Sequence, residues 1–224
     1  MKIELVVFDI AGTTVEDDDA VNDSFRAALN GAGLEVPYEV VNARMGFAKP
    51  YAIREILYEV QGSADDKQVE TIHSDFVARM IDYYETTPKL REVPGARQTF
   101  DTLRAAGIKV ALDTGFSRPI TDIILRRLGW IEGVVDATVC PEEAGAGRPQ
   151  PLMIRSLMAE LGVSDPACVA KVGDTPSDME EGANAGCSYI VGVTGGTHSR
   201  EQLEIYPHTH IIGTVAELPA LLLV

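Results

Sequence analysis

Short runs of apolar residues alternate along this chain with longer segments of helical periodicity. Six of these runs are rich in β-branched residues and end near Gly, Asp or Thr, which is typical of buried strands. They span residues 3–9, 108–114, 137–140, 169–174, 189–193 and 210–212. Helical patterns lie between them at residues 95–106, 119–128, 151–161 and 176–185. The alternation predicts an α/β fold with a doubly wound parallel sheet covered by helices on both faces.

Residues 16–87 interrupt this alternation. They contain only helical patterns, at residues 19–32, 38–43, 50–60 and 66–84. We therefore predict a small α-helical insert over residues 16–87, within an α/β core formed by residues 1–15 and 88–224. The acidic run at residues 16–19 is interpreted either as a cation site or, preferably, as a solvated linker before a helix.

Composition narrows the classes of partner. The chain has 224 residues, 46% of them hydrophobic, and a formal net charge of −15, which disfavours nucleic acid and anionic membranes. No apolar run approaches the roughly 20 residues that span a bilayer. The chain also enters its first strand without an apolar leader, so we expect a cytoplasmic protein. Cys140, Cys168 and Cys187 lack metal-type spacing and are expected to be small buried residues.

Polar residues follow four of the predicted strands. Asp9, Thr114, Arg148 and Asp174 lie at or just after strand ends, and the carboxyl ends of parallel strands share one edge of a sheet. The two carboxylates suit Mg²⁺. The Thr114 hydroxyl and the Arg148 guanidinium suit phosphoryl oxygens. The sequence therefore predicts phosphoryl chemistry at this edge.

Four motifs in this order resemble the haloacid dehalogenase superfamily, whose core is Rossmann-like. They lie at residues 9–14 (Asp-Ile-Ala-Gly-Thr-Thr), 114–118 (Thr-Gly-Phe-Ser-Arg), 146–149 (Ala-Gly-Arg-Pro) and 172–178 (Val-Gly-Asp-Thr-Pro-Ser-Asp). The resemblance implies that Asp9 is a nucleophile that forms an aspartyl-phosphate. It also implies that Asp9, the backbone carbonyl of Ala11 and Asp174 bind Mg²⁺. Asp178 would support the metal site without binding the ion directly. The helical insert matches the small cap of this superfamily.

Ala11 indicates a branch within the superfamily. Most phosphatases of this kind have a second Asp two residues after the nucleophile, as general acid and base. Alanine in its place resembles the phosphonatase branch, which cleaves a C–P bond. That branch forms a Schiff base between a cap lysine and an aldehyde.

Residues 45–49 (Met-Gly-Phe-Ala-Lys) match the cap motif of this branch. The resemblance implies that Met45 and Gly46, together with Thr114 and Gly115, line the substrate site. It implies further that Lys49 is the Schiff-base lysine. A solvated or phosphate-binding lysine is the alternative interpretation.

The chain differs from the branch at two positions. Ala52 replaces a histidine expected three residues after the lysine, and Phe116 lacks the hydroxyl of a tyrosine.

Three functions are carried forward. The first is a Mg²⁺-dependent hydrolase of a small phosphonate such as phosphonoacetaldehyde. The second is a phosphatase for a small phosphomonoester such as phosphoglycolate. The third is a non-catalytic protein that binds a phosphorylated ligand. The phosphonatase resemblance also leaves a homodimer open, which helix periodicity does not decide.

Overall fold

The structure, a computed structural model, describes residues 2–223 and contains a six-stranded parallel sheet. The strands are β1 (Leu5–Phe8), β2 (Lys109–Asp113), β3 (Ala137–Val139), β4 (Val169–Gly173), β5 (Tyr189–Val193) and β6 (His210–Ile212). Their order in the sheet is β3-β2-β1-β4-β5-β6, and all five pairings are parallel. The chain thus starts at the centre and winds outward in both directions. This confirms the predicted doubly wound sheet.

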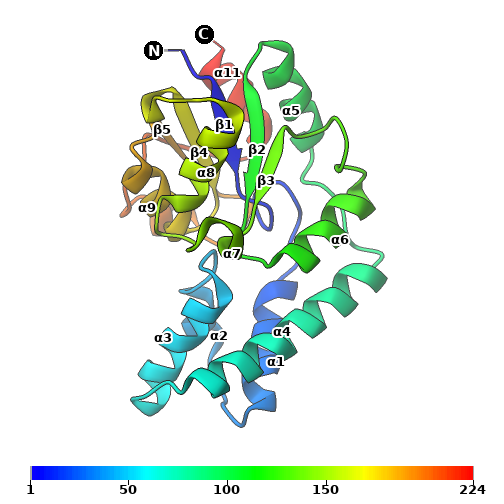
Figure 1. The fold of residues 1–224 in the computed structure, drawn as a ribbon, viewed down its shortest axis with the longest axis vertical. Helices are drawn as coiled ribbons and strands as arrows, with labels where there is room; N and C mark the ends of the chain where they lie inside the picture. The colour runs from blue at the N-terminus through cyan, green and yellow to red at the C-terminus, as the bar shows by residue number, and fades with distance from the viewer. Residues whose placement is uncertain (1, 224) are drawn as a thin grey trace.

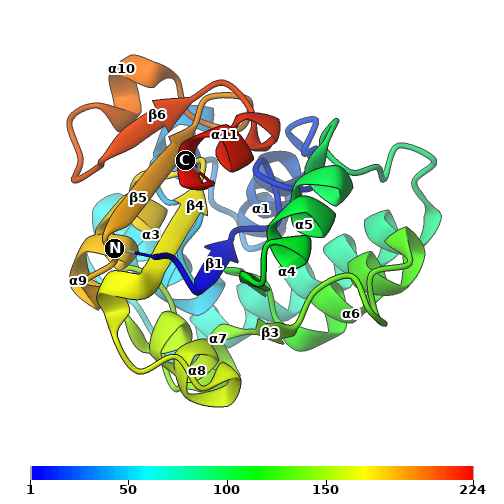
Figure 2. The same cartoon turned by 90° about the horizontal axis from the view of Figure 1, so that it is seen from above.

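Helices cover both faces of the sheet because successive side chains of a strand point to opposite sides. From β1, Val6 and Phe8 belong to the core shared with α5 (Ala96–Ala105) and α6 (Arg118–Leu128). Leu5 and Val7 belong to the core shared with α8 (Leu152–Leu161) and α9 (Pro176–Ala185). Seen from above, α8 and α9 lie on the opposite side of the sheet from α5 (Figure 2).

Four consecutive helices separate β1 from α5. They are α1 (Ala20–Gly31), α2 (Tyr38–Asn42), α3 (Lys49–Gln61) and α4 (Asp66–Thr86). Local signals set several of their ends: Pro50 lies in the first turn of α3, Gly62 ends it with φ 77°, and Asp65 caps α4 by accepting a hydrogen bond from the backbone N–H of Gln68. The bundle lies below the carboxyl ends of the strands, and both termini lie at the far end (Figure 1).

The two segments that connect this bundle to the core run side by side. The backbone N–H of Glu16 donates to the carbonyl of Arg91 at 3.1 Å, and that of Val93 donates to the carbonyl of Thr14 at 2.9 Å. We propose that this antiparallel pair is the hinge of the cap predicted at residues 16–87.

The C-terminal half of α4 also contacts the core. Arg127 of α6 donates hydrogen bonds to the carbonyls of Tyr84 and Thr87 at 2.7 and 2.9 Å. The rings of Tyr84 and Phe116 meet edge to face, 5.9 Å between centroids. The insert is therefore attached to the core at a second place, beyond its connecting segments.

Periodicity missed the shortest elements. These are the helices α7 (Pro141–Ala144), α10 (Arg200–Leu203) and α11 (Leu218–Leu222), and the 3₁₀ turns at Pro166–Cys168 and Val215–Glu217. One or two turns are too short to show a helical repeat. Cys140 and Cys187 are buried as expected, but Cys168 is only half-buried, because it lies in the turn before β4. Over residues 2–223, no helix is both long and apolar enough to cross a membrane.

Candidate active site

Three carboxylates meet at the carboxyl edge of the central strands. Asp9 directly follows β1, Asp113 ends β2 and Asp174 directly follows β4. Strand register explains their meeting, because Phe8 pairs with Leu112 on one side and with Val172 on the other. All three carboxylates are therefore at similar heights on adjacent strands, and all three are buried.

Hydrogen bonds from neighbouring loops and from the start of α9 orient the acidic groups around Asp9. Asp174 accepts from the Thr13 hydroxyl at 2.8 Å and from the Thr197 backbone N–H at 2.7 Å. Asp178, in the first turn of α9, accepts from the hydroxyl and the backbone N–H of Thr175 at 2.6 and 3.2 Å. Both carboxylate oxygens of Asp174 and one oxygen of Asp178 therefore already accept hydrogen bonds from the protein.

Arg148 is fully buried among four carboxylates. Its guanidinium lies 2.6 Å from Asp9 and 3.1 Å from Asp178, and it also pairs with Asp113 and Glu181. The sequence motif predicts a role for Arg148 only toward the substrate. In the structure it first neutralises carboxylates of the protein, so its role toward a substrate stays a prediction.

Sequence reasoning missed three members of this network, Asp113, Lys171 and Glu181. Lys171 pairs with Asp113, and with Asp178 and Glu181 at 3.1 Å each. A visible signal existed for Lys171, because a charged residue inside an apolar buried strand needs a partner. Glu181 had a weaker one, since it lies three residues after Asp178 on the same face of α9.

Burial and the charges within this network shift the pKa values of its carboxyl groups. Burial raises the pKa of Asp9 to about 8; Arg148 opposes this shift, and Asp178 and Asp174 add to it. Burial likewise raises the pKa of Asp174, with a further contribution from Asp178. Burial acts on Asp113 too, but Arg148 and Lys171 outweigh it and lower its pKa to about 2. Negative charge is therefore in excess around Asp9 and Asp174.

This charge distribution suits a divalent cation. Single oxygens of Asp9, Asp174 and Asp178 lie within 4.8 Å of one another, and all three residues are buried. In the part of the chain that the structure describes, two buried cations, Arg148 and Lys171, form ion pairs with four of the five carboxyl groups of this site. Oxygen donors with unbalanced negative charge are what Mg²⁺ requires. The residues therefore fit the cofactor that the sequence predicts.

Lys49 reaches this site from the insert. It is the first residue of α3 and only 3% exposed. Its amine lies 5.7 Å from the ring centres of Phe25 and Phe76, and 5.9 Å from that of Phe116. Burial lowers its pKa to about 8, although the charge of Asp9 acts in the opposite direction. The lysine is therefore not solvated, whereas its role as a Schiff-base lysine or as a phosphate-binding lysine stays a prediction.

Residues predicted from separate motifs line one small cavity of about 20 Å³, which holds about one water molecule. They are Asp9, Ala11, Met45, Gly46, Lys49, Thr114 and Gly115. Arg148, Asp174 and Asp178 lie outside this lining, in the network behind Asp9. The structure thus brings the predicted nucleophile and the predicted Schiff-base lysine to the same cavity.

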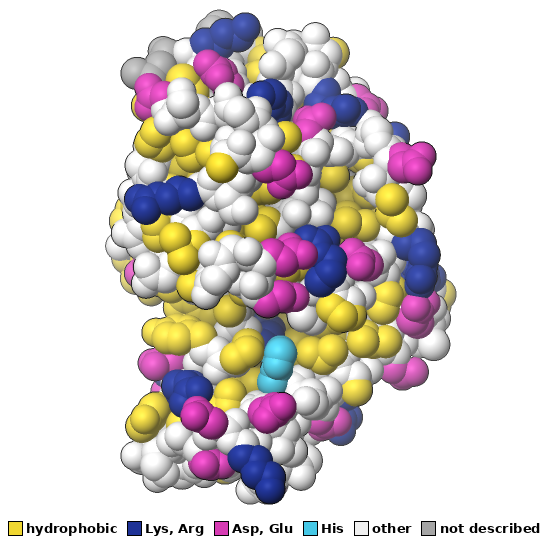
Figure 3. Space-filling model, viewed as in Figure 1, with side chains coloured by type: hydrophobic (Ala, Val, Ile, Leu, Met, Phe, Trp, Pro, Cys, Tyr) yellow, Lys and Arg dark blue, Asp and Glu magenta, His cyan; other side chains and the backbone are white. Residues whose placement is uncertain are grey.

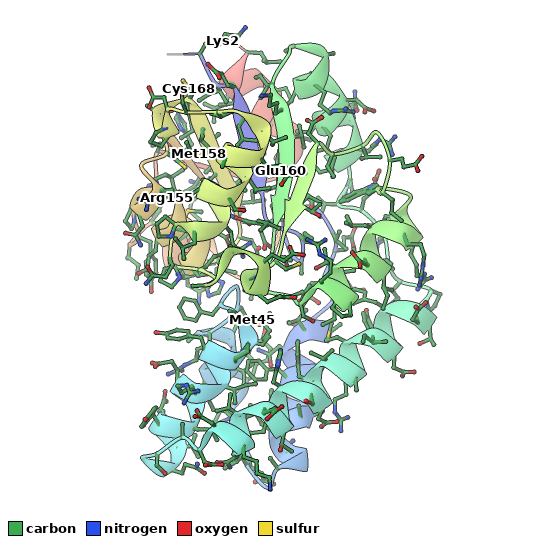
Figure 4. All side chains as sticks on the ribbon, in the orientation of Figure 1. Lys2, Met45, Arg155, Met158, Glu160 and Cys168 are labelled. Carbon is green, nitrogen blue, oxygen red and sulfur yellow. The ribbon has the colours of Figure 1, made fainter. Side chains whose placement is uncertain are left out.

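The loop before α3 packs directly against the core. A Cβ atom on Gly46, whose φ is +81°, would overlap the hydroxyls of Thr175 and Ser177, and one on Gly115 would lie 2.7 Å from the carbonyl oxygen of Phe47. Met45 lies at the boundary between the insert and the sheet (Figure 4). These contacts hold the loop before α3 against the carboxyl edge of the sheet.

The acidic run does not behave as a solvated linker throughout. Glu16 pairs with Arg91, and Asp18 lies 3.7 Å from the same guanidinium. Asp17 accepts a hydrogen bond from the first turn of α1 at 3.1 Å and is half-buried. Burial, with the charge of Asp174, raises the pKa of Asp17 to about 6. The linker interpretation was therefore wrong for Asp17.

The parallel sheet, the helical insert after β1 and the buried carboxylates at the strand ends are the architecture of a known class of α/β hydrolase. A model of the haloacid dehalogenase-like hydrolase family matches residues 3–186, so the chain belongs to that family.

Similar proteins point to one branch. A phosphonoacetaldehyde hydrolase of Bacteroides fragilis is 32% identical over 97% of this chain and 87% of its own length. A phosphonoacetaldehyde hydrolase of Bacillus mycoides is 34% identical over 88% of this chain and 78% of its own length. The resemblance to the phosphonatase branch is thereby confirmed.

Solved structures share the fold. A phosphonoacetaldehyde hydrolase-like protein from Oleispira antarctica has a TM-score of 0.85 at 23% identity, over all of this chain and 92% of that one. A predicted phosphoglycolate phosphatase from Haemophilus somnus has a TM-score of 0.78 at 19% identity, over 99% and 98% of the two chains. At these identities, both structures support the fold alone.

Proposed function

We propose that this hydrolase cleaves the C–P bond of a small 2-oxo phosphonate such as phosphonoacetaldehyde. The observation that carries the proposal is the position of Lys49, a buried amine that lines the same cavity as Asp9. Within residues 2–223, no carboxylate lies within ion-pairing distance of this amine. With a pKa of about 8, roughly one amine in ten is neutral at pH 7, against a few in ten thousand for an ordinary lysine.

A neutral Lys49 can form an imine with the substrate carbonyl, and this imine stabilises the carbon leaving group. The amine adds to the aldehyde carbon and water leaves, which forms a protonated imine. Asp9 then attacks phosphorus, the C–P bond breaks, and its electron pair moves into the imine to give an enamine. Water hydrolyses the aspartyl-phosphate to phosphate. The enamine takes a proton on carbon and is hydrolysed to acetaldehyde, which frees Lys49.

The surrounding residues prepare Asp9 for this attack. Arg148, 2.6 Å away, favours the ionised carboxylate against the effect of burial. The buried Thr114 hydroxyl lines the cavity, where it is placed to donate to a phosphoryl oxygen. Mg²⁺, held by Asp9 and Asp174 with Asp178 near them, would neutralise charge on the transferring group. Closure of the insert excludes bulk water.

Phosphomonoester hydrolysis is the second candidate, and Asp17 is the observation that favours it. An ester needs an acid for its leaving oxygen, and Ala11 provides none. Asp17, with a pKa of about 6, lines a cavity of about 650 Å³ together with Gly12, Met45 and Thr197, next to the site. Under this alternative, Asp17→Asn would abolish ester turnover.

One set of assays tests the proposal. The purified protein with Mg²⁺ is given phosphonoacetaldehyde and, separately, a panel of phosphate esters, with borohydride trapping in parallel. We expect phosphate release from phosphonoacetaldehyde and a reduced adduct on Lys49. Asp9→Asn should keep the adduct and lose phosphate release, whereas Lys49→Met should lose both. Full C–P cleavage by Lys49→Arg would refute the Schiff base. Turnover of esters alone would select the second candidate, and binding without turnover would select a non-catalytic role.

A further inference from the structure

Another cavity adjoins the small cavity of Asp9 at Lys49. It has a volume of about 640 Å³, and Lys49 and Gly115 line both cavities. Its other walls come from the start of α3, from α4 through His73, and from residues 141–150. We call it the side pocket. Its size lies within the range of about 300–1,000 Å³ that small-molecule sites occupy.

The side pocket suits carbon rather than charge. Much of its lining is small or apolar: Ala48, Pro50, Tyr51, Pro141, Ala146 and Pro149. Arg148 reaches the lining, but four carboxylates already occupy its guanidinium. Glu142 is exposed and would repel a second anion. Figure 3 shows hydrophobic side chains gathered at the narrowing between the insert and the core.

The order of groups along a substrate follows from these positions. Attack by Asp9 requires phosphorus beside its carboxylate, and imine formation requires the carbonyl carbon at the Lys49 amine. A substituent on that carbonyl carbon would point away from phosphorus, past Lys49 and into the side pocket. Phosphonoacetaldehyde has only a hydrogen there and would leave the side pocket unused.

We propose that the side pocket binds the carbon chain of 2-oxoalkyl phosphonates, so that ketones are substrates as well as the aldehyde. The proposal rests on the function proposed above. The ketone and Lys49 form an imine with loss of water, and the electron pair of the C–P bond moves into that imine. The net reaction consumes one water and gives phosphate and a methyl ketone.

Burial of apolar surface sets the size of the effect. Each methylene that enters the side pocket should raise kcat/KM about fourfold. The comparison is made within a ketone series, 2-oxopropyl-, 2-oxobutyl- and 2-oxopentylphosphonate, because ketones and aldehydes differ in reactivity. We expect kcat/KM to rise along this series in the wild-type protein.

A filled pocket provides the matched test. Ala146→Leu adds volume to the lining, and Ala159→Leu adds the same volume on the exposed face of α8. Ala146→Leu should flatten the rise of kcat/KM along the ketone series. Ala159→Leu should behave as wild type throughout. Borohydride trapping of each ketone on Lys49 reads binding independently of turnover and also reports whether each variant is folded.

The possible outcomes separate the two proposals. If phosphonoacetaldehyde is cleaved but kcat/KM is flat along the ketone series, the side-pocket proposal is overturned alone. If Ala146→Leu slows every substrate by the same factor, the cavity is a passage rather than a binding site, and the proposal also falls. If no 2-oxo phosphonate is cleaved or trapped, the proposed function fails, and this inference fails with it.

Discussion

Replacing Lys49 by Met should stabilise the protein while it removes C–P cleavage. The lysine is 3% exposed, and burial lowers its pKa from 10.5 to about 8. That difference corresponds to about 3 kcal/mol of unfavourable free energy for the charged amine in the native state. The three aromatic rings around the amine return part of it, up to about 2 kcal/mol. Met has a similar length and also packs well against rings, so we expect a net gain of about 1–3 kcal/mol.

The stability difference between Lys49→Met and wild type should depend on pH, because the pKa of Lys49 differs between the native and unfolded states. The native state binds fewer protons than the unfolded state between pH 8 and 10.5, so wild-type stability rises with pH across this window. The free-energy cost of burying the charged Lys49 amine is complete below pH 8 and disappears toward pH 10.5. The advantage of Lys49→Met should therefore be full at pH 7 and small at pH 10.

Urea unfolding with EDTA present, at pH 7 and at pH 10, measures both effects. Thermal scans should show a Tm higher by about 2–4 °C for each kcal/mol gained. Lys67→Met, at an exposed position of α4, is the matched control and should stay within about 0.5 kcal/mol of wild type. Destabilisation by Lys49→Met, or a gain that is equal at both pH values, would refute a penalty caused by burial.

Three further predictions concern activity and the buried network. On the proposed mechanism, the kcat/KM for phosphonoacetaldehyde should rise at least tenfold per pH unit up to pH 8 and then level off, because Lys49 reacts as the neutral amine and Asp9, whose pKa burial raises to about 8, attacks as the carboxylate; a flat profile from pH 6 to 9 would contradict these roles. Gly46→Ala should lower kcat/KM at least tenfold by obstructing cap closure. Gly62→Ala has a similar φ but open space around its Cβ, so it should stay within twofold; equal effects of the two would leave only backbone strain as the cause. Lys171→Met should lower the free energy of unfolding by about 3–5 kcal/mol, because it removes one of the two buried cations that form ion pairs with the carboxylates. Adding Glu181→Gln should recover part of that loss in urea melts, and strict additivity would count against a shared network.

Local patterns predicted most of the fold because each strand and long helix carries its own periodicity. Six apolar runs became the six strands, and each observed strand lies within its predicted bounds. The same patterns placed Asp9 and Asp174 at strand ends, which brings them together in any parallel sheet with adjacent β1 and β4. Short helices such as α10 escaped detection, because four residues cannot show a helical repeat.

Other features depended on how separate elements pack. The sequence by itself determined a doubly wound core, a helical insert, a nucleophile candidate at Asp9 and the absence of an acid at position 11. Only the tertiary structure decided that Lys49 is buried against the cavity of Asp9, that Arg148 and Lys171 share carboxylates, and that Asp17 turns inward. The reason is physical: periodicity follows from neighbours along the chain, whereas burial and charge pairing depend on side chains that approach from distant elements.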